Sequence, residues 1–123
     1  MNIVATTAVK EVRSKNVNNT RKIMLKHIVM WRFVDGALGK SRAEHAQWMK
    51  EHLEALVGVV PEIRSIEVGV NCYSSETAYD AILISTFDDK ESMDRYKVHP
   101  AHVAVAEYCK QVREGRVDID YEV

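Results

Sequence analysis

Hydrophobic and polar residues alternate in four short stretches of the chain, as they do in β-strands. These stretches cover residues 25–33, 63–70, 79–87 and 116–123. The first and the third carry apolar residues at both sets of alternating positions, so we expect each of them to bury two faces. The fourth is apolar at one set and mainly acidic at the other, which predicts a strand with one face in water.

Helical patterns separate these strands. After the first strand, apolar residues recur at the 3.6-residue period of a helix. Ser41 and Glu44 form the S-x-x-E signature of a helix start, and Gly58 with Pro61 predicts where that helix ends. Another apolar helical stripe precedes the fourth strand and is predicted to stop at Gly115.

Pro100 interrupts the helical pattern in the last third of the chain. Proline has no N–H and disfavours the helical conformation in the residue before it, yet it suits the first position of a new helix. The sequence therefore predicts a helix that ends near Val98, a corner at His99 and a second helix that begins at Pro100.

The order strand, helix, strand, strand, helix pair, strand predicts a ferredoxin-like β-α-β-β-α-β subunit, an α+β fold with helices on one face of the sheet. Helices on one side leave the other side of two apolar strands bare. At roughly 25 cal/mol per Å², a bare face of several hundred Å² would forgo on the order of 10 kcal/mol. We therefore expect a homodimer in which two sheets pack face to face around a two-fold axis as a barrel, with a cavity between sheet and helices.

Charge and composition narrow the possible partners. The 123 residues fit one domain, and 17 basic against 18 acidic residues indicate neither a nucleic-acid nor a membrane partner. The only two cysteines, Cys72 and Cys109, follow no metal-binding or redox spacing, which favours a reducing compartment and predicts a cytoplasmic location. No apolar run approaches the ~20 residues of a membrane helix.

The N-terminal residues differ from the rest of the chain. An apolar patch comes first there, and a polar, basic tract follows it. A signal peptide has the reverse order, with basic residues before a continuous apolar core. We therefore predict that residues 1–23 are an N-terminal extension and that residues 24–123 form the domain.

Two histidines of the first predicted helix, His45 and His52, lie on a second stripe beside Trp48. Seven residues at 1.5 Å per residue separate them by about 10 Å along the axis. Metal ligands need bonds of roughly 2 Å each, so the two side chains are not expected to share an ion. A solvated or interface role is predicted for both.

The predicted corner brings Tyr96, His99 and His102 close together. A phenol and two imidazoles are groups that exchange protons near neutral pH. The same residues also fit a purely structural interpretation, in which His99 caps a helix, Tyr96 lies in the core and His102 is half-buried. Residue type alone leaves both interpretations open.

Several segments together resemble the stress responsive A/B barrel domain (Dabb) family of the dimeric α+β barrel superfamily. The resemblance covers about residues 24–122, and a His-Pro-x-His corner preceded by a tyrosine is its most specific part. It implies a dimer of ferredoxin-like subunits, which agrees with the pattern of the strands. The segments are residues 25–33, 61–69, 79–80, 96–102 and 120–121.

The resemblance also implies candidate chemistry. Family members include proteins without an assigned reaction and a cofactor-independent plant cyclase that closes a polyketide by an intramolecular aldol reaction. By motif position, the catalytic pair of that cyclase falls on Tyr96 and His102, and a nearby histidine falls on His27. His102 would act as the base beside a carbonyl group while Tyr96 donates to the enolate oxygen. The chain departs from the cyclase at Ala81, where the cyclase has a histidine, and at Arg113, where it has a tryptophan.

We therefore weigh three functions. The first is a homodimeric, non-catalytic stress-response domain that binds a small ligand, with a second copy and that ligand as its partners. The second is a cofactor-independent cyclase, isomerase or lyase, and the third and weakest is a cofactor-free monooxygenase. No cofactor and no metal is expected from the residues, although family analogy leaves open an ion such as magnesium at the subunit interface. Predicted catalytic residues are His102, Tyr96 and His27, and predicted ligand-binding residues are Val29, Trp31, His99 and Arg113.

Overall fold

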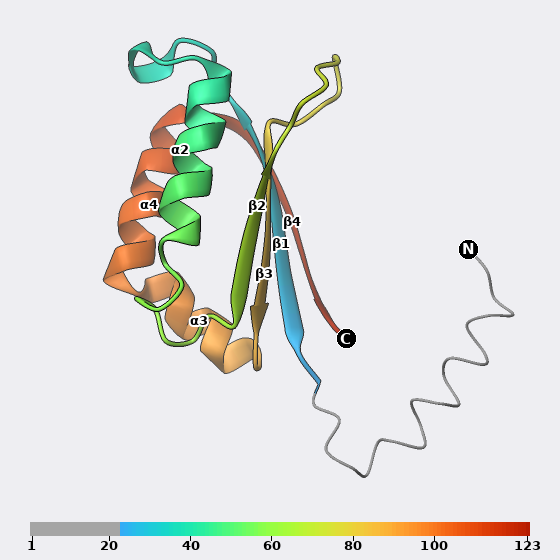
Figure 1. Ribbon diagram of the computed structural model, residues 1–123, viewed down its shortest axis with the longest axis vertical. Coiled ribbons are helices and arrows are strands. Elements are labelled where there is room, and N and C mark those ends of the chain that lie inside the picture. Colours follow the sequence, from blue (N-terminus) through green and yellow to red (C-terminus); the bar gives the residue numbers. More distant parts are fainter. Residues whose placement is uncertain (1–22) are drawn as a thin grey trace, which may run out of the picture.

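A computed structural model describes residues 23–123, which form a four-stranded antiparallel sheet with helices on one side (Figure 1). The strand order β2-β3-β1-β4 is that of the predicted ferredoxin-like α+β fold. Residues 1–22 of the predicted extension lie outside the described residues. The elements are β1 (Leu25–Phe33), the 3-10 turn η2 (Ala37–Gly39), α2 (Arg42–Glu54), β2 (Ser65–Val70), β3 (Ala81–Phe87), α3 (Lys90–Val98), α4 (Pro100–Val112) and β4 (Arg113–Glu122).

The start of α2 follows the capping signature in the sequence. The Ser41 hydroxyl accepts a hydrogen bond from the Glu44 N–H at 3.1 Å, and the Glu44 carboxylate accepts one from the Ser41 N–H at 2.8 Å. The helix ends at Glu54, earlier than the predicted Gly58. Gly58 instead adopts a left-handed conformation with φ 88° in the turn toward β2, where glycine carries no steric penalty.

The corner before Pro100 is built as predicted. His99 has φ −64° and ψ 133°, an extended conformation that ends α3 and places Pro100 at the first position of α4. The predicted stop at Gly115 is wrong: α4 ends at Val112, and Gly115 lies inside β4. A Cβ at Gly115 would stand 3.3 Å from the Tyr79 hydroxyl, so the close approach of that side chain favours glycine there.

The core lies between the sheet and the helices. Every second residue of β1 and of β3 is buried, as strands packed beneath helices require. Each fully buried large side chain stabilises the fold by roughly 1.5–3 kcal/mol. The largest of these side chains are Tyr96, Phe33, Phe87, Met49, Leu53 and Leu83.

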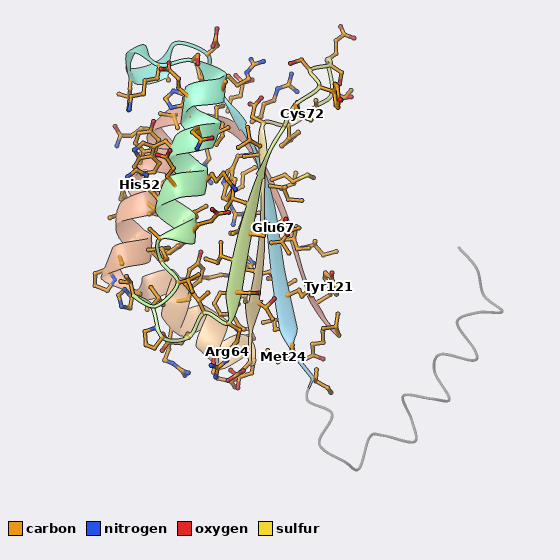
Figure 2. The ribbon with its side chains drawn as sticks, viewed as in Figure 1. Met24, His52, Arg64, Glu67, Cys72 and Tyr121 are labelled. Carbon is orange, nitrogen blue, oxygen red and sulfur yellow. The ribbon has the colours of Figure 1, made fainter. Side chains whose placement is uncertain are left out.

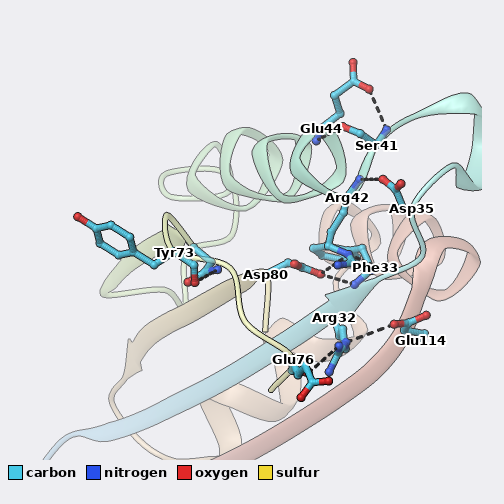
Figure 3. Close-up of polar contacts among 11 residues, drawn as sticks. Arg32, Phe33, Asp35, Ser41, Arg42, Glu44, Tyr73, Glu76, Asp80 and Glu114 are labelled. Atoms are coloured by element: carbon cyan, nitrogen blue, oxygen red, sulfur yellow. Dashed lines mark hydrogen bonds and ion pairs between the residues drawn. The ribbon is translucent and has the colours of Figure 1, made fainter. Parts of the chain in front are cut away.

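Asp80 connects the end of β1 to the start of α2 (Figure 3). Its carboxylate accepts a hydrogen bond from the Phe33 N–H at 2.7 Å and pairs with Arg42 Nε at 3.5 Å. The same Nε donates to the Phe33 carbonyl oxygen at 3.2 Å. This carboxylate therefore holds the sheet, the loop after β1 and the first turn of α2 in one arrangement.

The opposite side of the sheet, here called the open face, carries no helix of the described chain (Figure 1). Directly paired residues share a face, and Met30 pairs with both Ile82 and Val117. Figure 2 shows Tyr121 of β4 on this side, away from the helices. The apolar side of β4 thus belongs to the open face, and its charged side to the helix face. The apolar residues of the open face are Ile28, Met30, Ile82, Ile84, Val117, Ile119 and Tyr121.

No helix within residues 23–123 is both long and apolar enough to span a lipid bilayer.

Candidate functional site

A cavity of about 280 Å³ lies between the sheet and the helices. Strands β1, β3 and β4 form one side of it, and helices α2, α3 and α4 form the other. Its size is near the lower end of pockets that hold small molecules. Six of the seven residues predicted for the site line this cavity, namely His27, Val29, Trp31, Tyr96, His102 and Arg113.

His99 is the predicted site residue that does not line the cavity. Its Nδ1 accepts a hydrogen bond from the Ala101 N–H at 3.1 Å, so the imidazole caps the N-terminus of α4. His99 thus shapes the corner that carries Tyr96 and His102, and ligand binding by His99 stays a prediction.

His102, in the first turn of α4, presents a neutral imidazole to the cavity. Its Nδ1 lies 3.0 Å from the Lys97 carbonyl oxygen, which can only accept, so Nδ1 carries the proton and Nε2 keeps a lone pair. Burial lowers the pKa of His102 below its ordinary value of 6.5, and the positive charge of Arg116 acts in the same direction. The hydrogen bond to Lys97 opposes this shift without reversing it. The ring is therefore a base near neutral pH.

Tyr96, on α3, brings a hydroxyl that lacks a partner. The residue has 0% of its surface exposed, and the hydroxyl oxygen has no hydrogen bond within residues 23–123. Its ring centroid lies 4.3 Å from that of His102 and 6.5 Å from that of His27. Burial raises the pKa of Tyr96 far above its ordinary value of 10.0, although the charge of Arg116 opposes the shift. The phenol is therefore protonated and available as a donor.

His27, on β1, is held by a carboxylate of the neighbouring strand. Its Nδ1 lies 2.5 Å from Asp120 Oδ1, while only 4% of the histidine side chain is exposed. A carboxylate accepts the Nδ1 proton, so the Nε2 of a neutral ring keeps a lone pair. The Ser85 hydroxyl donates to the His27 carbonyl oxygen at 2.9 Å and fixes the strand beneath the ring.

Sequence reasoning assigned no role to Asp120, Lys110 or Arg116. Asp120 lies directly opposite His27 in the pairing of β1 with β4, and Lys110 and Arg116 line the cavity. The alternation of the last strand was a usable signal, because it puts Arg116, Asp118 and Asp120 on one face. The alternation does not indicate which face of the strand lies toward the helices.

The prediction of a solvated or interface role is wrong for His45 and fits His52. His45 has 0% of its surface exposed; its Nε2 donates to the Ala37 carbonyl oxygen at 2.9 Å, and its Nδ1 accepts from the Tyr108 hydroxyl at 2.6 Å. His52 is exposed and stacks on Trp48, with ring centroids 3.7 Å apart. Across residues 23–123, no group of three or more His, Cys, Asp or Glu side chains is arranged to hold a metal ion.

Comparison with known proteins agrees with this fold. The family model described as "Stress responsive A/B Barrel Domain" matches residues 25–123. An uncharacterised protein of Streptomyces coelicolor is 32% identical over 81 residues, which are 66% of this chain and 81% of that protein. Olivetolic acid cyclase of Cannabis sativa is 26% identical over 99 residues, which are 79% of this chain and 94% of the cyclase.

Among solved structures, a dimeric protein of unknown function with a ferredoxin-like fold from Bacteroides fragilis superposes with a TM-score of 0.69. It is 34% identical in sequence, and the match covers 81% of this chain and 96% of that protein. With a family model spanning all four strands and all three α-helices of the described fold, the chain belongs to the stress responsive A/B barrel domain family.

Proposed function

We propose that this protein is a homodimer whose cavity binds a small carbonyl compound and removes a proton from the carbon beside the carbonyl group, without a cofactor. The observation that carries the proposal is the unpartnered, fully buried hydroxyl of Tyr96, a residue that lines the cavity together with the neutral His102. An unpaired buried hydroxyl costs roughly 1–3 kcal/mol, and a ligand oxygen at that point would remove the cost.

The chemistry follows from the protonation of the two side chains. His102 Nε2 takes the α-proton, the electrons of the broken C–H bond form a C=C bond, and the carbonyl π electrons move to oxygen. Tyr96 donates a hydrogen bond to that developing enolate oxygen, a stabilisation that is strongest in a site shielded from water. The phenol stays protonated because burial raises its pKa. Attack of the enolate on a second carbonyl would give a cyclase, and loss of a leaving group would give a lyase.

His27 and Asp120 are positioning residues in this scheme. The short contact between them fixes the orientation of the His27 ring, whose centroid lies 6.5 Å from that of Tyr96. The olivetolic acid cyclase relative supports a cyclase reaction at family level. Ala81 stands where the resemblance places a histidine of that cyclase, and it does not line the cavity, so the substrate of that relative is not carried over to this chain.

The homodimer rests on the open face. Met30, Val117, Ile119 and Tyr121 are 38%, 44%, 60% and 40% exposed there, in a chain with no helix on that side among its described residues. A continuous apolar patch of this kind marks an interface. The Bacteroides fragilis relative is described as dimeric, which supports the same assembly here.

The second candidate is a non-catalytic domain that binds a small ligand in the same cavity. The hydrogen bond from His102 to the Lys97 carbonyl favours it, because that bond ties α4 to the last turn of α3 and is a structural role in itself. No feature of the described residues favours the monooxygenase hypothesis over either candidate, and we do not propose it.

Deuterium uptake separates the two candidates. The wild-type protein in D2O should exchange the hydrogens beside the carbonyl of methyl levulinate, a small neutral ketone, and NMR measures the rate. His102→Gln should lower that rate by about 10²–10⁴-fold, the usual contribution of a general base. His52→Gln is the matched control, since His52 is exposed on α2 and does not line the cavity. Binding of the ketone without exchange above the buffer rate would support the non-catalytic candidate instead.

A further inference from the structure

The cavity has a strongly uneven charge. Among residues 23–123, three cationic side chains line it, Lys110, Arg113 and Arg116, and no Asp or Glu does. The whole chain has a formal net charge of −1, so this is a local excess and not the general character of the protein. Clefts lined by one sign of charge raise the local concentration of oppositely charged ligands.

The three cationic side chains differ in whether they already form an ion pair with an acidic residue. Arg116 pairs with Asp118 at 2.7 Å, and Lys110 pairs with Glu107 at 3.4 Å. Arg113 is half-buried, and its guanidinium makes no hydrogen bond or ion pair within the described part of the chain. Taking a charged group out of water without a partner is unfavourable, so an anion at Arg113 would be stabilised.

Arg113 is also fixed in place. It is the C-cap of α4, where its N–H donates to the Cys109 carbonyl oxygen, and it is the first residue of β4, paired with Phe33 of β1. A guanidinium on such a rigid base can offer two parallel N–H donors to a carboxylate. Carboxylates are the anions for which that fork geometry is suited.

The cations and the proton-transfer pair lie at different points along α4. His102 is in its first turn and Arg113 follows its last residue, so about 16 Å of helix separates their backbones. Arg116 lies between these ends, because it pairs with Trp31 of β1. Trp31 stands between Phe33, which pairs with Arg113, and His27, whose ring lies 6.5 Å from that of Tyr96. A ligand that reaches from one end to the other is extended, with its charged group remote from its reacting carbon.

We propose that the substrate of this cavity is a keto acid, whose carboxylate binds Arg113 and Arg116 while its ketone lies at Tyr96 and His102. The placement of the ketone at Tyr96 and His102 rests on the proposed function. The binding of the carboxylate depends only on the cationic side chains, so it can be tested even if no reaction occurs.

The test compares levulinate and longer methyl-keto acids with their methyl esters, which differ only in the charge. NMR titration of the wild-type protein should show at least one acid binding about tenfold or more tightly than its ester, as expected for a charge-assisted hydrogen bond. Added salt should reduce that preference, because the arginines are near the solvent.

Variants locate the carboxylate site. Arg113→Gln should remove the preference for the acid while the ester binds as before, and Arg113→Lys should retain part of it. Arg64→Gln is the matched control, because Arg64 pairs with Asp88 and does not line the cavity, so its loss should change neither affinity. If Arg113→Gln does not fold, the salt dependence and Arg113→Lys still test the proposal.

The possible results separate this inference from the proposed function. Acids and esters that bind equally well, or fail to bind, overturn the carboxylate site, even if His102-dependent exchange of the ester is observed. A preference for the acid that survives in Arg113→Gln also overturns it. A preference that depends on Arg113, without any deuterium exchange, supports the carboxylate site and rejects the proton-abstraction proposal.

Discussion

Replacing Tyr96 with Phe should make the protein more stable and less active at the same time. The side chain has 0% of its surface exposed, and its hydroxyl has no partner in the described residues. The Tyr96→Phe variant removes this oxygen and keeps the ring against His102 and Phe87, whose centroids lie at 4.3 and 4.9 Å. Because an unpaired buried hydroxyl costs roughly 1–3 kcal/mol, we expect the free energy of unfolding to rise by about that amount.

Urea unfolding measures this change, with both proteins at one concentration because the stability of a dimer depends on it. Tyr108→Phe is the matched control. The Tyr108 hydroxyl donates to Nδ1 of the buried His45 at 2.6 Å, so its removal leaves that nitrogen unpaired. We expect Tyr108→Phe to lower the free energy of unfolding by roughly 1–3 kcal/mol, opposite in sign to Tyr96→Phe.

The opposite changes in the free energy of unfolding expected for Tyr96→Phe and Tyr108→Phe allow the reasoning to be refuted. If Tyr96→Phe destabilises the protein as much as Tyr108→Phe does, the Tyr96 hydroxyl is hydrogen-bonded in the ligand-free protein. It is then not an unpartnered donor that a ligand could use. In the exchange assay, Tyr96→Phe should slow deuterium uptake by about 10²–10³-fold, the usual effect of removing one donor to an oxyanion. An unchanged rate would remove Tyr96 from the mechanism.

Two further predictions concern the open face and pH. Ile119 is 60% exposed on the open face, so Ile119→Lys should leave each protomer folded but bury a charge between the sheets, and light scattering should report monomers. Val103→Lys, at a 39% exposed position on α4, should remain a dimer. Because burial lowers the pKa of His102, its neutral form persists below pH 6.5, and the exchange rate should fall with an apparent pKa below that value. The stability of the protein should also fall as the pH is lowered. The His102 imidazole takes up a proton at higher pH in the unfolded chain than in the folded one, so the free energy of unfolding decreases as the pH drops through 6.5. This decrease should be smaller in His102→Gln. A midpoint above pH 6.5 for the exchange rate would exclude His102 as the base.

The sequence by itself determined the elements and their order. The capping pair Ser41 and Glu44 begins α2 where the pattern predicts, and Pro100 separates α3 from α4 with His99 at the corner. The alternation of β1 put His27, Val29 and Trp31 on one face, and all three line the cavity. These features follow from the chain within a few residues of each position, where side-chain spacing and backbone sterics decide the conformation.

Only the tertiary structure decided what each polar side chain contacts. His27 and Asp120 are 93 residues apart in sequence and meet because β1 pairs with β4 in one register. His45 on α2 is buried against Tyr108 of α4, whose hydroxyl bonds to it. The Tyr96 hydroxyl has no partner because no described residue places a polar atom within hydrogen-bond distance of it. Such contacts depend on how distant segments pack. A hydrophobic pattern records that a residue is buried, but not which partner it finds there.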